Sequence, residues 1–417
     1  MVDQRCCWTR GKVLGGGSVL NTMLYIRGNK RDYDQWESFG NTGWGFDDVL
    51  PYFKKSEDQR NPYLAKNTKY HSTGGLWTVQ ESPYNTPIGP AFLQAGEEMG
   101  YEIVDVNGAQ QTGFAFYQLN MRRGSRCSTA KSFLRPISIV MKRLVNINTA
   151  LRYAITEDGP LTSSVGLEAV AFVNTKYANA SDDWPDMNFM LTSASTNSDG
   201  GTQIKNAHGL TDEFYNEVYG EISNRDVFGI FPMMLRPKSR GFITLQSKNP
   251  LRYPLLYHNY LTHPDDVNVL REGVKTALAL AETQSMKRFG ARFWRKPLPN
   301  CKHLPLFTDE YWECAIRQYT MTIYHMSCTA KMGPSTDPLA VVDPQLRVHG
   351  IQGLRVIDAS IMPTITNGNI HAPVVMIAEK GADLVKELWL EDSFLRIKRD
   401  STDNRTKSSE TTKKIIS

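Results

Sequence analysis

The sequence lacks a long apolar run. No stretch of its 417 residues approaches the roughly 18 consecutive apolar residues of a membrane-spanning helix. The longest apolar segment lies around 372–378 and is typical of a core helix. We therefore expect no membrane span.

The sequence also lacks a strong charge of one sign. The formal net charge is +5, and 22% of the residues are charged. Lysines and arginines are scattered among acidic residues, without the basic stripe and interleaved aromatics that a nucleic-acid-binding surface needs. We therefore expect no nucleic-acid partner. The hydrophobic fraction of 41% excludes a disordered chain, and the length suffices for two or three domains.

Cysteine is scarce, with six residues in the chain, and no CxxC or HExxH pattern occurs. We therefore expect neither a disulfide framework nor a metal site. Cys301 and Cys314 are near each other in sequence and leave two interpretations open. They form a disulfide in an oxidising compartment, or they are two buried free thiols.

Two catalytic signatures are missing. The Gly-x-Ser-x-Gly nucleophile elbow is absent, which disfavours a hydrolase. The Gly-x-Gly-x-x-Gly fingerprint of dinucleotide-binding domains is absent too. Residues 1–10 contain no apolar segment of the kind that forms a signal peptide.

Helical and strand periodicities are nevertheless clear. Residues 31–58 are predicted to be helical, and residues 86–102 carry an amphipathic helix that ends at Gly100. A further helix begins near Pro264, where Asp265 and Asp266 favour the helix dipole. Strands are predicted at 112–120, 241–245 and 354–357.

Two regions have patterns typical of ligand sites. Residues 10–29 place three glycines and a serine before an apolar stretch, which is either a loop that approaches a ligand closely or a turn before a core helix. The predicted strand 354–357, a loop at 363–369 and a helix beginning at Pro373 form the kind of crevice in which α/β folds bind cofactors.

His325 lies in an apolar run that ends at a glycine turn. An imidazole in such a place is either a general base or a buried core residue with a satisfied hydrogen bond. His371, at the start of the last predicted helix, raises the same question.

The run Arg10–Asn29 resembles the first signature of the glucose–methanol–choline (GMC) oxidoreductases. Three further runs, at 324–334, 341–348 and 353–369, resemble the family's C-terminal block. The resemblance extends from about Trp8 to Leu390. The runs 183–186 and 236–241 make the chain most similar to the insect FAD-dependent glucose dehydrogenase branch.

The resemblance implies an α/β (α+β) flavoenzyme that binds FAD and oxidises an alcohol or a sugar such as glucose by hydride transfer. It implies that electrons pass to an acceptor such as a quinone. His325 matches the catalytic base, and Asn369 matches its hydrogen-bonding partner. The implied cofactor-binding residues are Gly15, Gly16, Ser18, Asn21, Met23, Tyr324, Asp358, Ala359 and Asn369.

Two segments that family members use for FAD are expected to be missing. One is the opening strand with its glycine fingerprint, and the other is the family's second signature, which would follow Pro136. We expect a partial Rossmann-like FAD-binding region at 1–136 and a substrate domain of sheet and helices at 137–320. Residues 321–390 return to the FAD domain with the catalytic residues, and 391–417 form a disordered tail.

An alternative stays open at this point, namely that the chain is a non-catalytic, truncated family member that cannot bind FAD. The resemblance also allows a secreted protein, for which the sequons at Asn179 and Asn404 would be glycosylation acceptors.

Overall fold

The computed structural model describes residues 9–134, 166–223 and 225–390. The expected tail at 391–417 and the expected missing signature after Pro136 lie outside the described residues. Within these residues, no helix has the length and apolar character that crossing a membrane requires.

The largest sheet consists of four antiparallel strands in the order β3-β7-β8-β9. Its strands are β3 (Gly113–Phe116), β7 (Leu167–Val173), β8 (Met187–Thr192) and β9 (Gly229–Met234).

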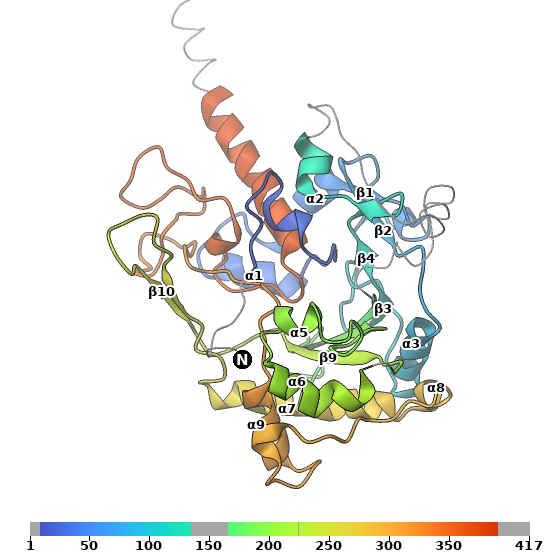
Figure 1. The fold of residues 1–417 in the computed structure, drawn as a ribbon. Helices are drawn as coiled ribbons and strands as arrows, with labels where there is room; N and C mark the ends of the chain where they lie inside the picture. The colour runs from blue at the N-terminus through green and yellow to red at the C-terminus, as the bar shows by residue number, and fades with distance from the viewer. Residues whose placement is uncertain (1–8, 135–165, 224, 391–417) are drawn as a thin grey trace, which may run out of the picture.

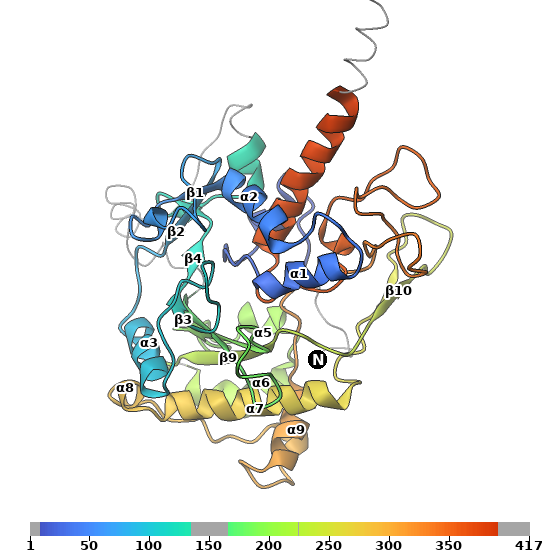
Figure 2. The same ribbon diagram turned by 180° about the vertical axis from the view of Figure 1, so that it is seen from behind.

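Both faces of this sheet are covered, as strand β7 shows. Every residue of β7 is buried, and its side chains alternate between two cores. Ala169 and Ala171 pack in the core that contains α3 (Ile88–Glu98) and α7 (Pro264–Ala281). Phe172 faces the opposite core with Ile26. In both views α7 runs along one side of the sheet (Figures 1 and 2).

A second region joins the beginning and the end of the described chain. Strands β1 (Glu57–Gln59), β2 (Trp77–Glu81) and β4 (Gln118–Leu119) form its three-stranded sheet. Helices α1 (Lys30–Ser38) and α2 (Phe46–Ser56) share one aromatic-rich core with residues from 332–377. A helix at 371–390 closes this core and is the red helix of Figure 1.

The remaining elements are short. The other α-helices are α5 (Ile204–Ala207), α6 (Asp212–Tyr219), α8 (Gln284–Lys287) and α9 (Asp309–Gln318). The strands are β5 (Met121–Arg122), β6 (Ser125–Arg126), β10 (Phe242–Thr244) and β11 (Leu255–Tyr257). The hairpin of β10 and β11 extends away from the sheet in both views (Figures 1 and 2).

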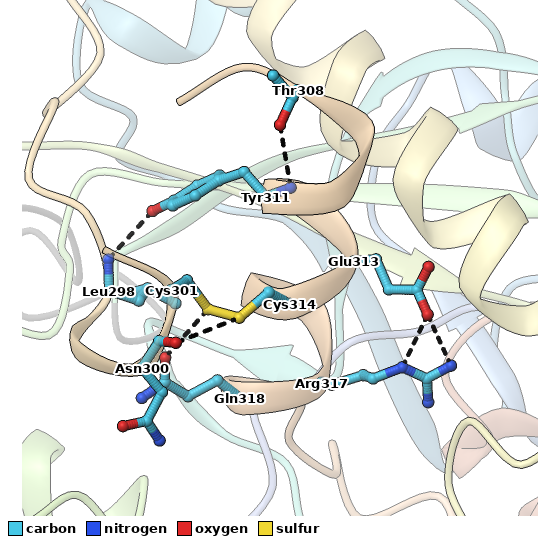
Figure 3. Close-up of a disulfide and its surroundings, with 9 residues drawn as sticks. All are labelled: Leu298, Asn300, Cys301, Thr308, Tyr311, Glu313, Cys314, Arg317 and Gln318. Carbon is cyan, nitrogen blue, oxygen red and sulfur yellow. Dashed lines mark hydrogen bonds and ion pairs between the residues drawn. A yellow bond between two sulfur atoms is a disulfide. The ribbon is translucent and has the colours of Figure 1, made fainter. Parts of the chain in front are cut away.

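Cys301 and Cys314 are joined in a disulfide, with their Cα atoms 5.9 Å apart (Figure 3). The loop between them enters α9, where the Thr308 hydroxyl accepts a hydrogen bond from the Tyr311 N–H. The Tyr311 hydroxyl in turn accepts from the Leu298 N–H at 3.1 Å. Of the two interpretations left open by the sequence, the structure therefore contains the disulfide.

The predicted helices near 88 and 264 and the strands near 113 and 242 are confirmed as α3, α7, β3 and β10. The predicted helical stretch 31–58 divides into α1 and α2. The strand predicted at 354–357 is wrong, because only Arg355 pairs, as an isolated bridge to Arg347. Gly350 and Gly353 both adopt positive φ beside it, which turns the backbone before a ladder can extend.

Candidate active site

His325 and Asn369 lie together in the structure although 44 residues separate them. The Nδ2 atom of Asn369 is 3.3 Å from Nε2 of His325. When the neutral ring carries its proton on Nδ1, the Asn369 amide donates to the Nε2 lone pair. The two residues that the resemblance implies as catalytic are therefore hydrogen-bonded partners.

The His325 side chain is half-buried, and its surroundings favour the neutral ring. Removal from water lowers the pKa of His325 to about 4. The imidazole is therefore neutral at physiological pH and presents a lone pair that can accept a proton.

The backbone around His325 is unusual. Tyr324 and Cys328 adopt φ values of 67° and 71°, in the left-handed region that side chains other than glycine rarely occupy. Such conformations persist where the surrounding structure holds them, and they cluster at functional sites.

The segment after His325 is held beside the short helix Ala359–Ile361. The N–H of Cys328 donates to the Ala359 carbonyl at 3.2 Å, and the N–H of Met332 donates to the Ile361 carbonyl at 2.8 Å. Asp358 caps this helix, since its carboxylate accepts from the Ser360 N–H. Tyr324, Asp358 and Ala359 therefore belong to one folded unit with His325.

The glycine-rich loop forms a second unit. Gly15 has a φ of 95°, and a Cβ there would lie 2.9 Å from the Ala130 Cβ, so this position requires glycine. Gly16 begins a short 3-10 helix, Gly16–Val19, with a φ of 51°. The Ser18 hydroxyl accepts from the Thr129 N–H at 3.0 Å, which ties the loop to the segment after β6.

Asn21 links this loop to the start of helix 371–390. Its Nδ2 lies 2.9 Å from Nδ1 of His371, and its Oδ1 accepts from Arg126 at 2.8 Å. Met23 follows with a φ of 64°, and its N–H donates to Asn21 Oδ1. In both views the blue N-terminal segment lies beside the start of the red helix (Figures 1 and 2).

Two residues near this loop, Asn120 and His371, are not among the site residues that the resemblance implies. Asn120 is 1% exposed, donates its N–H to the Met23 carbonyl, and has no side-chain partner among the described residues for either amide atom. His371 Nε2 is likewise buried and unpartnered there, and the His371 ring packs edge-on against Trp77 at 4.6 Å. Burial and the nearby Arg126 lower the pKa of His371 to about 3. The only sequence signal was the position of His371 at the start of a helix.

These features fit the flavin that the resemblance implies. Unpartnered buried donors and acceptors are costly unless a ligand or water satisfies them. The edge of the isoalloxazine ring carries hydrogen-bond donors and acceptors of the kind that the unpartnered atoms of Asn120 and His371 lack. Within the described part of the chain, no group of three or more His, Cys, Asp or Glu residues could hold a metal ion.

Comparisons with known proteins agree with this geometry. Two family profiles, both described as GMC oxidoreductase, match residues 1–171 and 237–378. The chain is 38% identical to glucose dehydrogenase (FAD, quinone) of Drosophila pseudoobscura pseudoobscura, over 93% of the chain and 76% of the relative. The Drosophila melanogaster protein of that name is 35% identical over the same shares. Mitochondrial choline dehydrogenase of Mus musculus is 28% identical, over 95% of the chain and 78% of the relative.

Solved structures show the same fold. Formate oxidase of Aspergillus oryzae superposes with a TM-score of 0.72 at 20% identity, over 91% of this chain and 84% of that one. Pyridoxine 4-oxidase from Mesorbium loti gives 0.70 at 20% identity, over 90% and 84%. The architecture is thus a mixed α/β fold with FAD-binding and substrate-binding parts, and the chain belongs to the GMC oxidoreductases, an oxidoreductase family whose members bind FAD.

Proposed function

We propose that this chain is an FAD-dependent oxidoreductase that acts on the CH–OH group of an alcohol or a sugar such as glucose, with a quinone as electron acceptor. The Drosophila relatives at 35–38% identity carry both glucose and quinone in their names, which supports this substrate and acceptor class. The choline dehydrogenases are more distant at 28–29% identity.

The pair of His325 and Asn369 is the observation that carries the proposal. The Nε2 lone pair of the neutral imidazole accepts from Asn369 in the structure. When the substrate hydroxyl takes the place of this donor, the ring can take the hydroxyl proton, which leaves the carbon ready to lose hydride. The Asn369 amide, released from Nε2, then donates a hydrogen bond to the substrate oxygen. FAD, when bound, supplies the hydride acceptor.

The flavin would be held by the two units that meet at helix 371–390. Gly15, Gly16, Ser18, Asn21 and Met23 form the loop against one side. Tyr324, Asp358 and Ala359 belong to the unit that carries His325. The N-terminus of helix 371–390 favours negative charge nearby, as a reduced flavin would carry. We retain the proposed division into an FAD-binding region at 1–136, a substrate domain at 137–320 and a returning block at 321–390.

The test is the absorption spectrum of the purified chain. Bound flavin with its visible absorption bands, bleached by glucose or an alcohol and restored by a quinone, is the expected result. A chain that carries flavin but is bleached by neither class of donor would overturn the proposed substrate.

Two observations favour a second candidate, a non-catalytic family member that does not bind FAD. The alignment with the Drosophila pseudoobscura relative spans 475 positions, more than the 417 residues of the chain, so the relative has internal segments that this chain lacks. The hairpin of β10 and β11 is also exposed along both strands, and Leu245, which follows β10, is 85% exposed. Exposed apolar side chains of this kind are expected where a covering segment is missing. A folded but colourless protein that does not take up added FAD would support this candidate.

A further inference from the structure

Asp32 is a buried carboxylate at which three separate parts of the chain meet. It lies in α1, is 2% exposed, and has no ion-pair partner within 4.0 Å among the described residues. Three N–H groups instead donate to its two oxygens. Hydrogen bonds to an ionised acceptor are shorter and stronger than neutral ones.

The three donors come from distant segments. The Asn29 N–H donates to Oδ2 at 2.8 Å within the capping box of α1. The Trp184 indole N–H, from the segment before β8, donates to Oδ1 at 2.9 Å. The Asn367 N–H, from the loop that carries Asn369, donates to Oδ2 at 2.7 Å.

Further hydrogen bonds surround this junction. The Asn367 side chain donates to the Pro185 carbonyl at 2.8 Å, and the Gln111 side chain donates to the Asn367 carbonyl at 3.2 Å. Gln111 accepts in turn from the Asn29 side chain at 3.1 Å. Asn367 is fully buried. The loop is therefore held at residue 367 through its N–H, its carbonyl and its side chain.

The backbone between Asn367 and Asn369 has little freedom to move. Gly368 has a φ of 111°, and a Cβ there would lie 2.6 Å from a methyl group of Ile26. The backbone between the junction and Asn369 is therefore packed closely against the core. The next side chain is Asn369, whose amide contacts His325 at 3.3 Å.

We propose that Asp32 is a positioning residue, whose ionised carboxylate holds the 363–369 loop so that Asn369 reaches His325. The inference rests on the proposed function for its catalytic consequence. Its structural part, the hold on the loop, stands on the hydrogen bonds alone.

The charge state of Asp32 gives the proposal a pH dependence. Burial raises the pKa of Asp32 to about 6, against the lowering effect of its three hydrogen bonds and of Arg236. The Arg236 guanidinium stacks on Trp184 at 4.1 Å. Its positive charge acts on Asp186 and Asp182 as well as on Asp32. Arg31 faces Arg236 as well, and Tyr33 faces Asp32. Protonation near pH 6 removes an acceptor and loosens the loop.

The first test is amide hydrogen exchange of the 363–371 loop, measured by mass spectrometry and corrected for intrinsic rates. In Asp32→Asn, exchange in this loop is expected to be about 10- to 100-fold faster at pH 8, since an amide nitrogen then faces one of the donors. Asp47→Asn is the matched control, because its carboxylate is 88% exposed and the same charge is removed. Unchanged loop exchange in Asp32→Asn would overturn the proposal.

The second test is the pH profile of kcat/KM with glucose and a quinone. The wild type is expected to lose activity below about pH 6, where Asp32 becomes protonated. This acid limb lies at higher pH than the limb near pH 4 that protonation of His325 would cause. Asp32→Asn is expected to lower kcat about tenfold at pH 8 and to abolish the limb near pH 6. A purely structural defect would lower activity without removing that limb.

Trp184→Phe keeps the test decisive if Asp32→Asn does not fold. It removes one donor and keeps a ring beside Arg236, so the acid limb is expected to move to higher pH while activity at pH 8 persists. A limb that stays in place would contradict the proposal. If the wild type shows no activity but its loop exchange still depends on Asp32, the proposed function alone would be overturned.

Discussion

The Asn21 amide lies 2.9 Å from Nδ1 of His371, although 350 residues separate them in the chain. This contact joins the glycine-rich loop to the first turn of helix 371–390. Arg126 donates to the other atom of the same amide. One side chain thus connects three segments around the region in which we place the flavin.

Asn21→Ala is expected to weaken FAD binding about tenfold, since it removes hydrogen bonds worth roughly 1 kcal/mol or more that join the glycine-rich loop to His371 and Arg126. Titration of the apoprotein with FAD, followed by flavin fluorescence, measures the change. Asn249→Ala is the control, because Asn249 is exposed beyond β10. Equal affinities for both variants would show that Asn21 does not shape the flavin site.

His325→Ala is expected to lower kcat about 10²- to 10⁴-fold, the usual contribution of a general base. Bound flavin should remain, because the glycine-rich loop is untouched. Steady-state kinetics and the flavin spectrum of the same sample give both quantities. His303→Ala, in an exposed loop, serves as the control. Full turnover in His325→Ala would remove His325 from the mechanism.

His71 is expected to make stability depend on pH. Its Nδ1 lies 2.9 Å from Glu57 and its Nε2 lies 2.7 Å from Asp105. Only the doubly protonated ring can donate to both carboxylates. Burial alone would lower the pKa of His71, but the hydrogen bonds to Asp105 and Glu57 outweigh it and the pKa is raised.

A raised folded-state pKa stabilises the protein fully below the unfolded value of 6.5, and this stabilisation is lost as pH rises through the folded value. His71→Gln is expected to lower the free energy of unfolding by about 1–3 kcal/mol at pH 5.5, and by less at high pH. Urea unfolding, followed by tryptophan fluorescence, checks this. A difference that does not shrink with rising pH would show that His71 is neutral in the folded protein.

Removal of the Cys301–Cys314 disulfide is expected to destabilise the loop that it closes. In the chain-entropy account, a disulfide that closes a loop of this size raises the free energy of unfolding by about 3 kcal/mol. The double variant Cys301→Ser/Cys314→Ser should therefore be cleaved faster by protease between 301 and 314 than the wild type. Dithiothreitol should speed cleavage of the wild type and leave the variant unchanged. An equal response of both proteins would show that the bond is not formed in solution.

Local sequence patterns predicted several elements correctly. The amphipathic spacing predicted α3, and Pro264 with its acidic neighbours predicted the start of α7. These signals work because helix periodicity and capping depend on neighbours within a turn. The strand predicted at 354–357 failed because a strand needs a partner, and the turns at Gly350 and Gly353 allow pairing only at Arg355.

The sequence by itself determined which residues carry the family's motifs, and His325 and Asn369 were singled out from those motifs. It left the pairing of Cys301 and Cys314 open and gave no sign of the role of Asp32. Only the tertiary structure brought Asn369 to 3.3 Å from His325 and the Asn367 N–H to 2.7 Å from Asp32. The physical reason is that a buried polar group must find its partner wherever the fold places one, and sequence distance does not limit that choice.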